Sequence, residues 1–171
     1  MSTPVRAERW SSLLCKLFTL VLVCGCGARH VDPYTGTWHL DLDRSGGEPR
    51  TQTLSIQVRD NTETYRSEMV WPNGRRQITT YTAGYDGGEY PSTTVIAEPG
   101  GKTAQREDVV VLKRLDAARR ERYWHQGGRL VRILRREISP DGRTLTSQLI
   151  DVDESGNESA GAKLVFERSG R

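Results

Sequence analysis

The chain has 171 residues, of which 27% are charged and 35% hydrophobic, a length that accommodates one domain behind a short leader. Residues 1–25 hold three basic side chains and one acidic one, so the remaining chain keeps only +1 of the formal net charge of +3. This low charge gives nucleic-acid binding little electrostatic support. All three cysteines fall within residues 1–26, so we expect no disulfide bond in the domain.

Residues 1–25 are expected to be an export signal peptide. Basic residues precede Leu17–Val23, an apolar run too short to span a membrane, and the segment ends in Val23-Cys24-Gly25-Cys26. This ending resembles the bacterial lipoprotein signal, which implies cleavage before Cys26 and attachment of fatty acyl chains such as palmitate. Cys24 departs from the Ala, Ser or Thr that the signal prefers, so an ordinary secretory signal is the alternative. The resemblance implies a membrane-anchored protein of the cell envelope that faces the periplasm, and Gly27 favours the outer membrane.

The domain is expected to span residues 36–171, behind a tether at residues 26–35 in which Pro33 stops regular structure just before the domain. The alternation that follows places Trp38, Leu40 and Leu42 on one face, which predicts a strand with one buried side. Further strands are predicted at residues 54–58, 62–71, 75–85, 90–97, 109–112, 123–126, 129–139, 144–151 and 163–168. The sequence therefore predicts nine or ten strands and no helix.

Turn residues separate the predicted strands. Gly127-Gly128 suits a two-residue hairpin and Pro140-Asp141-Gly142 a tight turn, so consecutive strands should run antiparallel. Such a meander closes most economically into an up-and-down barrel of about eight to ten strands, because closure removes exposed edges. An open or flattened meander is the alternative.

Three segments are irregular within this pattern. Residues 98–107 are expected to be the longest loop, and Pro91 suggests that its strand lies at an edge or is irregular. The uninterrupted apolar run Val109–Leu112 predicts a strand buried on both faces or a short core segment.

The domain resembles the bacterial lipocalin-like lipoproteins of uncharacterised function. Three segments carry the resemblance: Gly36-Thr37-Trp38-His39-Leu40-Asp41-Leu42-Asp43-Arg44-Ser45, Tyr85-Asp86-Gly87-Gly88-Glu89-Tyr90-Pro91 and Ile138-Ser139-Pro140-Asp141-Gly142-Arg143-Thr144-Leu145-Thr146. It implies a barrel with a cavity and no settled activity. Gly36-x-Trp38 also resembles the Gly-x-Trp of true lipocalins, which implies that Trp38 plugs one barrel end under Arg168. The arginine-rich residues 116–122 and the loop at 98–107 depart from the family.

Candidate ligand contacts come from arginines and aromatic residues. Arg132 and Arg136 share a strand face with Leu130, Leu134 and Ile138, an arrangement that would suit a carboxylate-headed apolar ligand if the face pointed inward. The alternative, which the pattern somewhat favours, is that this face is in water while Val131 and Ile133 fill the core. Aromatic residues with polar tips suit a partly wet cavity, and the candidates are Trp71, Tyr81 and Tyr123.

No motif predicts catalysis, a cofactor or a metal site. The histidines lack ligand spacing, and no nucleophile elbow, domain cysteine or phosphate loop is present in the sequence. Asp151-x-Asp153 resembles the start of a calcium loop, but Ala162 stands where the bidentate Glu would be, so a polar hairpin turn is favoured. We therefore expect a non-enzymatic lipoprotein that binds a small apolar or amphiphilic molecule. The alternative is a structural or protein-interaction module of the envelope with a filled barrel.

Overall fold

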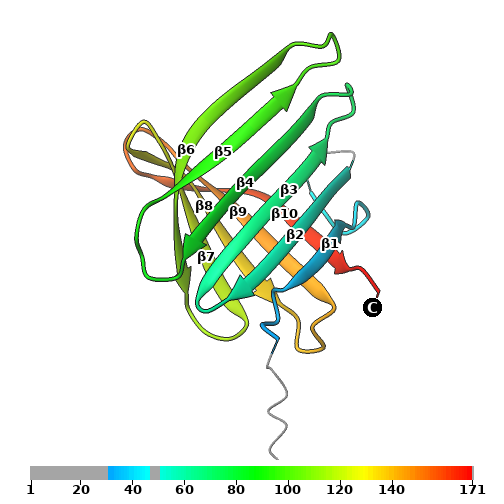
Figure 1. The fold of residues 1–171 in the computed structure, drawn as a ribbon, viewed down its shortest axis with the longest axis vertical. Coiled ribbons are helices and arrows are strands. Elements are labelled where there is room, and N and C mark those ends of the chain that lie inside the picture. Colours follow the sequence, from blue (N-terminus) through cyan, green and yellow to red (C-terminus); the bar gives the residue numbers. More distant parts are fainter. Residues whose placement is uncertain (1–30, 47–50, 171) are drawn as a thin grey trace, which may run out of the picture. The chain divides into compact units, whose positions relative to one another are not determined.

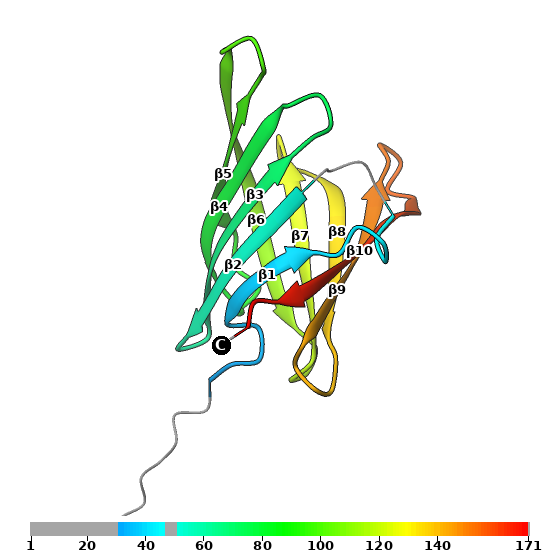
Figure 2. The same cartoon turned by 90° about the vertical axis from the view of Figure 1, so that its right-hand side faces the viewer.

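The computed structural model describes residues 31–46 and 51–170, which fold into ten antiparallel strands closed into a barrel (Figures 1 and 2). The strands are β1 (Gly36–Leu40), β2 (Thr51–Arg59), β3 (Thr62–Val70), β4 (Arg76–Gly84), β5 (Tyr90–Ala97), β6 (Thr103–Arg114), β7 (Arg119–Gln126), β8 (Arg129–Ile138), β9 (Thr144–Val152) and β10 (Glu158–Arg168). This confirms the all-β prediction. Cys26 and the predicted signal peptide lie outside the described residues. Nowhere in the described ranges is there a helix that is long and apolar enough to cross a membrane.

Each strand pairs with its neighbours in sequence, and β1 closes the barrel against β10, with Trp38 opposite Arg168. The open meander is therefore excluded. The strand of Pro91 is not at an edge, because β5 lies between β4 and β6. Its pairing with β4 ends at Ser92, opposite Tyr81, so the proline stands just beyond the last pair of that ladder.

Residues with positive φ form the tight turns between strands. Gly127 and Gly128 have φ of 56° and 79°, as a two-residue hairpin of the predicted kind requires. Asp60 and Asn61 adopt the same left-handed region between β2 and β3, where these residue types are the most tolerant after glycine.

Strand pairing extends several elements beyond their predicted bounds, most of all β6, β7 and β10. The predicted loop at residues 98–107 is strand in its second half: a short turn closes with a hydrogen bond from Glu98 N to Lys102 O, and Thr103 onward pairs with β5. β7 begins at Arg119 and β10 at Glu158. These stretches are polar and lack a clear alternation, and partner strands supply the hydrogen bonds that make them extend. In β6 the burial alternates, so Val110 and Leu112 face the interior and the predicted double burial of residues 109–112 is wrong.

One end of the barrel is closed by residues 31–35, which precede β1, together with Trp38 of β1. This end carries the β2–β3, β6–β7 and β8–β9 turns together with residues 31–35 (Figure 1). Residues 31–35, predicted to belong to a tether, instead pack against the barrel: Tyr34 is fully buried and its hydroxyl donates to Ala118 O at 2.9 Å. The packed unit therefore begins at Val31 rather than at residue 36.

Trp38 is fully buried in this closed end, with its Nε1 donating to Tyr34 O at 3.1 Å. The guanidinium of Arg168 lies 4.1 Å from the Trp38 ring centroid. Gly36 makes this possible, because a Cβ at that position would come within 2.7 Å of Arg168 Nη1. The structure thus brings the three predicted plug residues together. Leu42, predicted to share the buried face, lies beyond β1 and is exposed.

Candidate functional site

A cavity of about 370 Å³ lies inside the barrel, toward the end opposite Trp38. Its wall is shared by β2–β4, β6 and β7–β10, and it combines aliphatic, aromatic and polar side chains. The lining residues are Gln52, Leu54, Tyr65, Met69, Gln77, Arg106, Arg122, Trp124, Gln126, Val131, Arg132, Leu134, Arg136, Ser147, Leu149, Leu164 and Phe166. Most come from alternate positions along their strands, because every second side chain of a barrel strand points inward.

A buried ion pair between Glu63 of β3 and Arg136 of β8 contributes to the floor of the cavity. Arg136 Nη2 donates to both carboxylate oxygens of Glu63 at 3.0 Å, and both residues are almost fully buried. Tyr81 donates to Glu63 Oε1 at 2.6 Å and Tyr85 donates to Oε2. The carboxylate therefore accepts charge-assisted hydrogen bonds at both oxygens, which is how a buried charge is tolerated.

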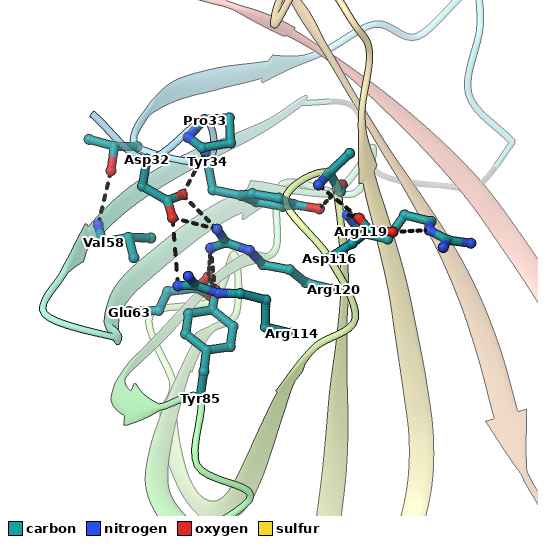
Figure 3. A network of polar contacts seen from close by, with 12 residues as sticks. Asp32, Pro33, Tyr34, Val58, Glu63, Tyr85, Arg114, Asp116, Arg119 and Arg120 are labelled. Carbon is teal, nitrogen blue, oxygen red and sulfur yellow. Dashed lines mark hydrogen bonds and ion pairs between the residues drawn. The ribbon is translucent and has the colours of Figure 1, made fainter. Parts of the chain in front are cut away.

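This pair continues into a polar network that reaches the closed end (Figure 3). Arg120 Nη1 donates to the Tyr85 hydroxyl at 2.6 Å and lies 3.9 Å from Glu63. Its Nη2 donates to both oxygens of Asp32, at 2.7 and 2.6 Å. The face of the Arg120 guanidinium lies 4.0 Å from the Tyr34 ring centroid. Residues 31–35 are therefore tied to the interior by charge as well as by packing.

Electrostatic interactions keep Glu63 ionised within this polar network. Burial by itself would raise the pKa of the Glu63 carboxyl, but the charge of Arg136 and the hydrogen bonds from Tyr81 and Tyr85 outweigh it, and the pKa lies below its ordinary value. Burial and the Glu63 charge raise the pKa of Tyr81 well above 10, so this hydroxyl stays protonated as a donor.

Arg122 of β7 lines the cavity next to this polar network, and it is only 6% exposed. Three aromatic rings surround its guanidinium, with centroids 4.8 Å (Tyr65), 5.4 Å (Tyr81) and 5.4 Å (Trp124) away. Its Nη1 makes one long hydrogen bond, 3.4 Å, to the Tyr81 hydroxyl. In the part of the chain that the structure describes, no carboxylate forms an ion pair with Arg122, unlike the other buried arginines.

Several buried polar atoms around the cavity have no hydrogen-bond partner among the described residues. Those on lining residues are Gln52 Oε1, Arg122 Nε, Trp124 Nε1, Arg136 Nε, Arg136 Nη1 and Ser147 Oγ. Burying such atoms without partners costs about 1 to 3 kcal/mol each, and more for charged groups. Six of these atoms therefore belong to five side chains that line one cavity.

The structure settles which face of β8 points inward. Leu134, Arg136 and Ile138 are buried, so the face favoured as solvent-exposed is the interior one. A bulge opposite Trp124 and His125 then brings both Val131 and Arg132 to the cavity wall. Ile133 is also buried, but it lies outside the central core cluster.

The five predicted ligand contacts fall in different places. Arg132 and Arg136 line the cavity, but both are already paired: Arg132 Nη2 lies 2.6 Å from Asp151 Oδ1, and Arg136 binds Glu63. Tyr81 is interior and donates to Glu63 rather than lining the cavity. Trp71 and Tyr123 are not cavity residues.

Trp71 lies in the turn after β3, under the guanidinium of Arg75. Tyr123 alternates with Arg122 and Trp124 and therefore occupies the outer face, where it donates to Glu121 at 2.5 Å. Burial and this hydrogen bond raise the pKa of Tyr123 to about 12.

Sequence reasoning missed Glu63 and Arg122, the two charged residues central to the site. A signal for Arg122 was present, because Arg120, Arg122 and Trp124 share a face that follows the apolar β6. It was obscured because the predicted strand began at Tyr123, one residue too late to include Arg122. Alternation places Glu63 on the same face of β3 as Tyr65 and Ser67, but the strand is polar and a glutamate beside a turn is usually exposed, so this signal was weak.

The acidic hairpin at residues 151–158 has a structural role. Asp153 Oδ1 accepts from the backbone amides of Ser155 and Asn157 at 2.8 and 2.9 Å, which caps the β9–β10 turn. Asp151 pairs with Arg132. The carboxylates thus serve a polar hairpin turn, as the sequence favoured.

Comparison with known proteins finds no protein-family model and no curated protein that matches this chain.

Proposed function

We propose that this protein is a lipid-anchored, periplasm-facing lipoprotein of the lipocalin-like kind that binds a small amphiphilic molecule in its barrel without catalysing a reaction. The observation that carries the proposal is the cavity of about 370 Å³ lined by the strands. Small-molecule sites occupy about 300 to 1,000 Å³ and combine apolar walls with a few polar groups, and this cavity has both properties. The anchor rests on Val23-Cys24-Gly25-Cys26.

The chemistry of the wall supports an amphiphile over a purely apolar ligand. Leu54, Leu134, Leu149, Leu164 and Phe166 offer an aliphatic and aromatic surface. Arginine, glutamine and tryptophan side chains on the same cavity carry buried polar atoms without partners. An apolar molecule would leave those atoms desolvated and unpaired, which costs free energy.

The volume limits the size of the ligand. At about 30 Å³ each, the cavity would hold about a dozen waters, and a methylene group takes a similar share of a liquid. A medium-chain compound such as 1-decanol or decanoate therefore fits. A longer chain would extend through the mouth toward solvent.

Native mass spectrometry and calorimetric titration of the full chain test the proposal. We expect an additional small-molecule mass that disappears on denaturation, or saturable binding of 1-decanol or decanoate once the protein is delipidated. Leu149→Trp should fill the cavity and abolish both, whereas Gln105→Trp, on an exposed position of β6, should change neither. A folded wild type that carries no added mass and binds neither probe would favour the filled structural barrel.

A further inference from the structure

We propose that the cavity selects a monoanionic head group, and that Arg122 is the residue that recognises it. This inference rests on the proposed function, because it names the ligand class of the same site. The bound molecule would be a medium-chain carboxylate, with its carboxylate at Arg122 and its chain along the aliphatic wall.

The first argument is the charge of the interior. Three arginines of the described chain are almost fully buried there: Arg120, Arg122 and Arg136. Asp32 and Glu63 neutralise two of them, through Arg120 and Arg136. Arg122 keeps a net positive charge in a low-dielectric environment, where an anion is strongly favoured.

The second argument is the geometry around Arg122. Aromatic faces of Tyr65, Tyr81 and Trp124 hold the guanidinium, and such contacts attract the cation without occupying all its N–H donors. Arg122 Nε has no partner among the described residues. Trp124 Nε1 and Arg136 Nη1, on the same cavity, lack partners too. Arg122, Trp124 and Arg136 all line the cavity, and guanidinium and indole N–H groups only donate, which suits an acceptor-only group such as a carboxylate.

The third argument concerns the number of charges on the ligand. One unpaired buried arginine balances one negative charge, so a carboxylate would leave the interior neutral. A phosphate monoester carries nearly two charges at pH 7, and one of them would stay uncompensated in the barrel. Lysine is absent from the lining, and Arg106 and Arg132 near the mouth are already paired with Asp108 and Asp151.

The orientation of the ligand follows from the position of Arg122 above the charged floor. Tyr81 links Arg122 to the Glu63–Arg136 ion pair, since its hydroxyl donates to Glu63 and accepts from Arg122. A carboxylate at Arg122 would therefore lie deep in the barrel. Its alkyl chain would pass Leu149 and Leu164 toward Met69 and Val131.

Calorimetric titration of the delipidated full chain with decanoate and with 1-decanol tests this inference. The two probes share their chain and differ in head-group charge. A charge-assisted hydrogen bond contributes about 1.5 to 3 kcal/mol, so wild type should bind decanoate at least about tenfold more tightly. Decyl phosphate should bind more weakly than decanoate.

Arg122→Met should bring decanoate and 1-decanol to similar affinities, while Arg122→Lys should retain part of the preference. Arg135→Met is the matched control, because Arg135 is an exposed arginine on β8. Arg122→Met should also raise the thermal midpoint of the ligand-free protein, since it removes a buried charge that no carboxylate of the described chain balances.

The outcomes separate the two proposals. Binding of 1-decanol as tightly as decanoate by wild type overturns the inference and leaves the cavity function intact, and this comparison needs no variant. A decanoate preference that survives in folded Arg122→Met likewise overturns the role of Arg122. Failure of wild type to bind either probe overturns the proposed function itself.

Discussion

Glu63 and Arg136, 73 residues apart in sequence, form an ion pair that spans the interior of the barrel from β3 to β8. Neither strand is a neighbour of the other in the sheet. Removing a carboxylate and guanidinium from water costs several kcal/mol per ion, which a pair recovers only with good geometry and further hydrogen bonds. Here Tyr81 and Tyr85 supply those bonds.

Glu63→Gln should destabilise the protein by about 3 to 5 kcal/mol, because it leaves Arg136 charged and unpaired in the barrel. The measurement is the free energy of unfolding from urea denaturation. In the double variant Glu63→Leu with Arg136→Met, which removes both charges, most of the loss should be recovered. A single variant as stable as wild type would show that the pair is not formed in solution.

The stability of wild type should fall in acid, and part of this fall should belong to Glu63. Because its pKa is lower in the folded state, ionised Glu63 stabilises the fold above its unfolded pKa of about 4.3. This contribution is lost as the pH falls through the lower folded pKa. Urea midpoints measured from pH 7 to about pH 2 should therefore drop more steeply for wild type than for Glu63→Gln. Parallel curves would contradict the assignment.

Trp38→Ala should cost about 3 to 5 kcal/mol, the range for truncating a buried large aromatic. The loss would remove the ring that Arg168 covers and the hydrogen bond to Tyr34 O. Denaturation midpoints give the comparison, with Trp71→Ala, which alters a partly exposed turn residue, as the control. Equal midpoints for the two variants would mean that Trp38 does not plug the barrel.

Asp32→Asn should loosen residues 31–35 from the barrel and lower stability by about 2 kcal/mol, because Arg120 loses its carboxylate partner. Hydrogen exchange at the amide of Thr35, which donates to Asp32 O at 2.9 Å, reports the loosening. Asp41→Asn, which weakens an exposed ion pair, should leave that amide unchanged. Unaltered exchange in Asp32→Asn would show that packing of Tyr34 alone holds the segment.

Cys26→Ala should release the protein from the membrane or stall its processing, because it removes the residue that would carry the acyl chains. Several acyl chains together give stable attachment, which a single chain does not. Membrane fractionation and metabolic labelling with radioactive palmitate provide the readouts. Cys24→Ala, which brings Val23-Cys24-Gly25-Cys26 closer to the bacterial signal, should keep the label. Wild type that takes up no label would contradict the lipoprotein assignment.

The sequence by itself determined the fold class, because the features that specify strands are local. Alternation such as Leu54, Ile56 and Val58 places side chains on two faces of a strand, and glycine pairs such as Gly127-Gly128 adopt the positive φ of a hairpin. These features need no distant partner. The resemblance of Gly36-x-Trp38 to a known motif also predicted that Trp38 lies at a barrel end.

Only the tertiary structure decided which faces point inward and which charges meet. The alternation of side chains divides β8 into two faces but does not say which one is the interior, and in the closed barrel the face with Arg136 is the buried one. The partner of Arg136 comes from β3, across the barrel, so no spacing along the chain could identify Glu63. Arg122 is distinguished by having no such partner among the described residues, and a pairing or its absence exists only once the strands surround a common interior.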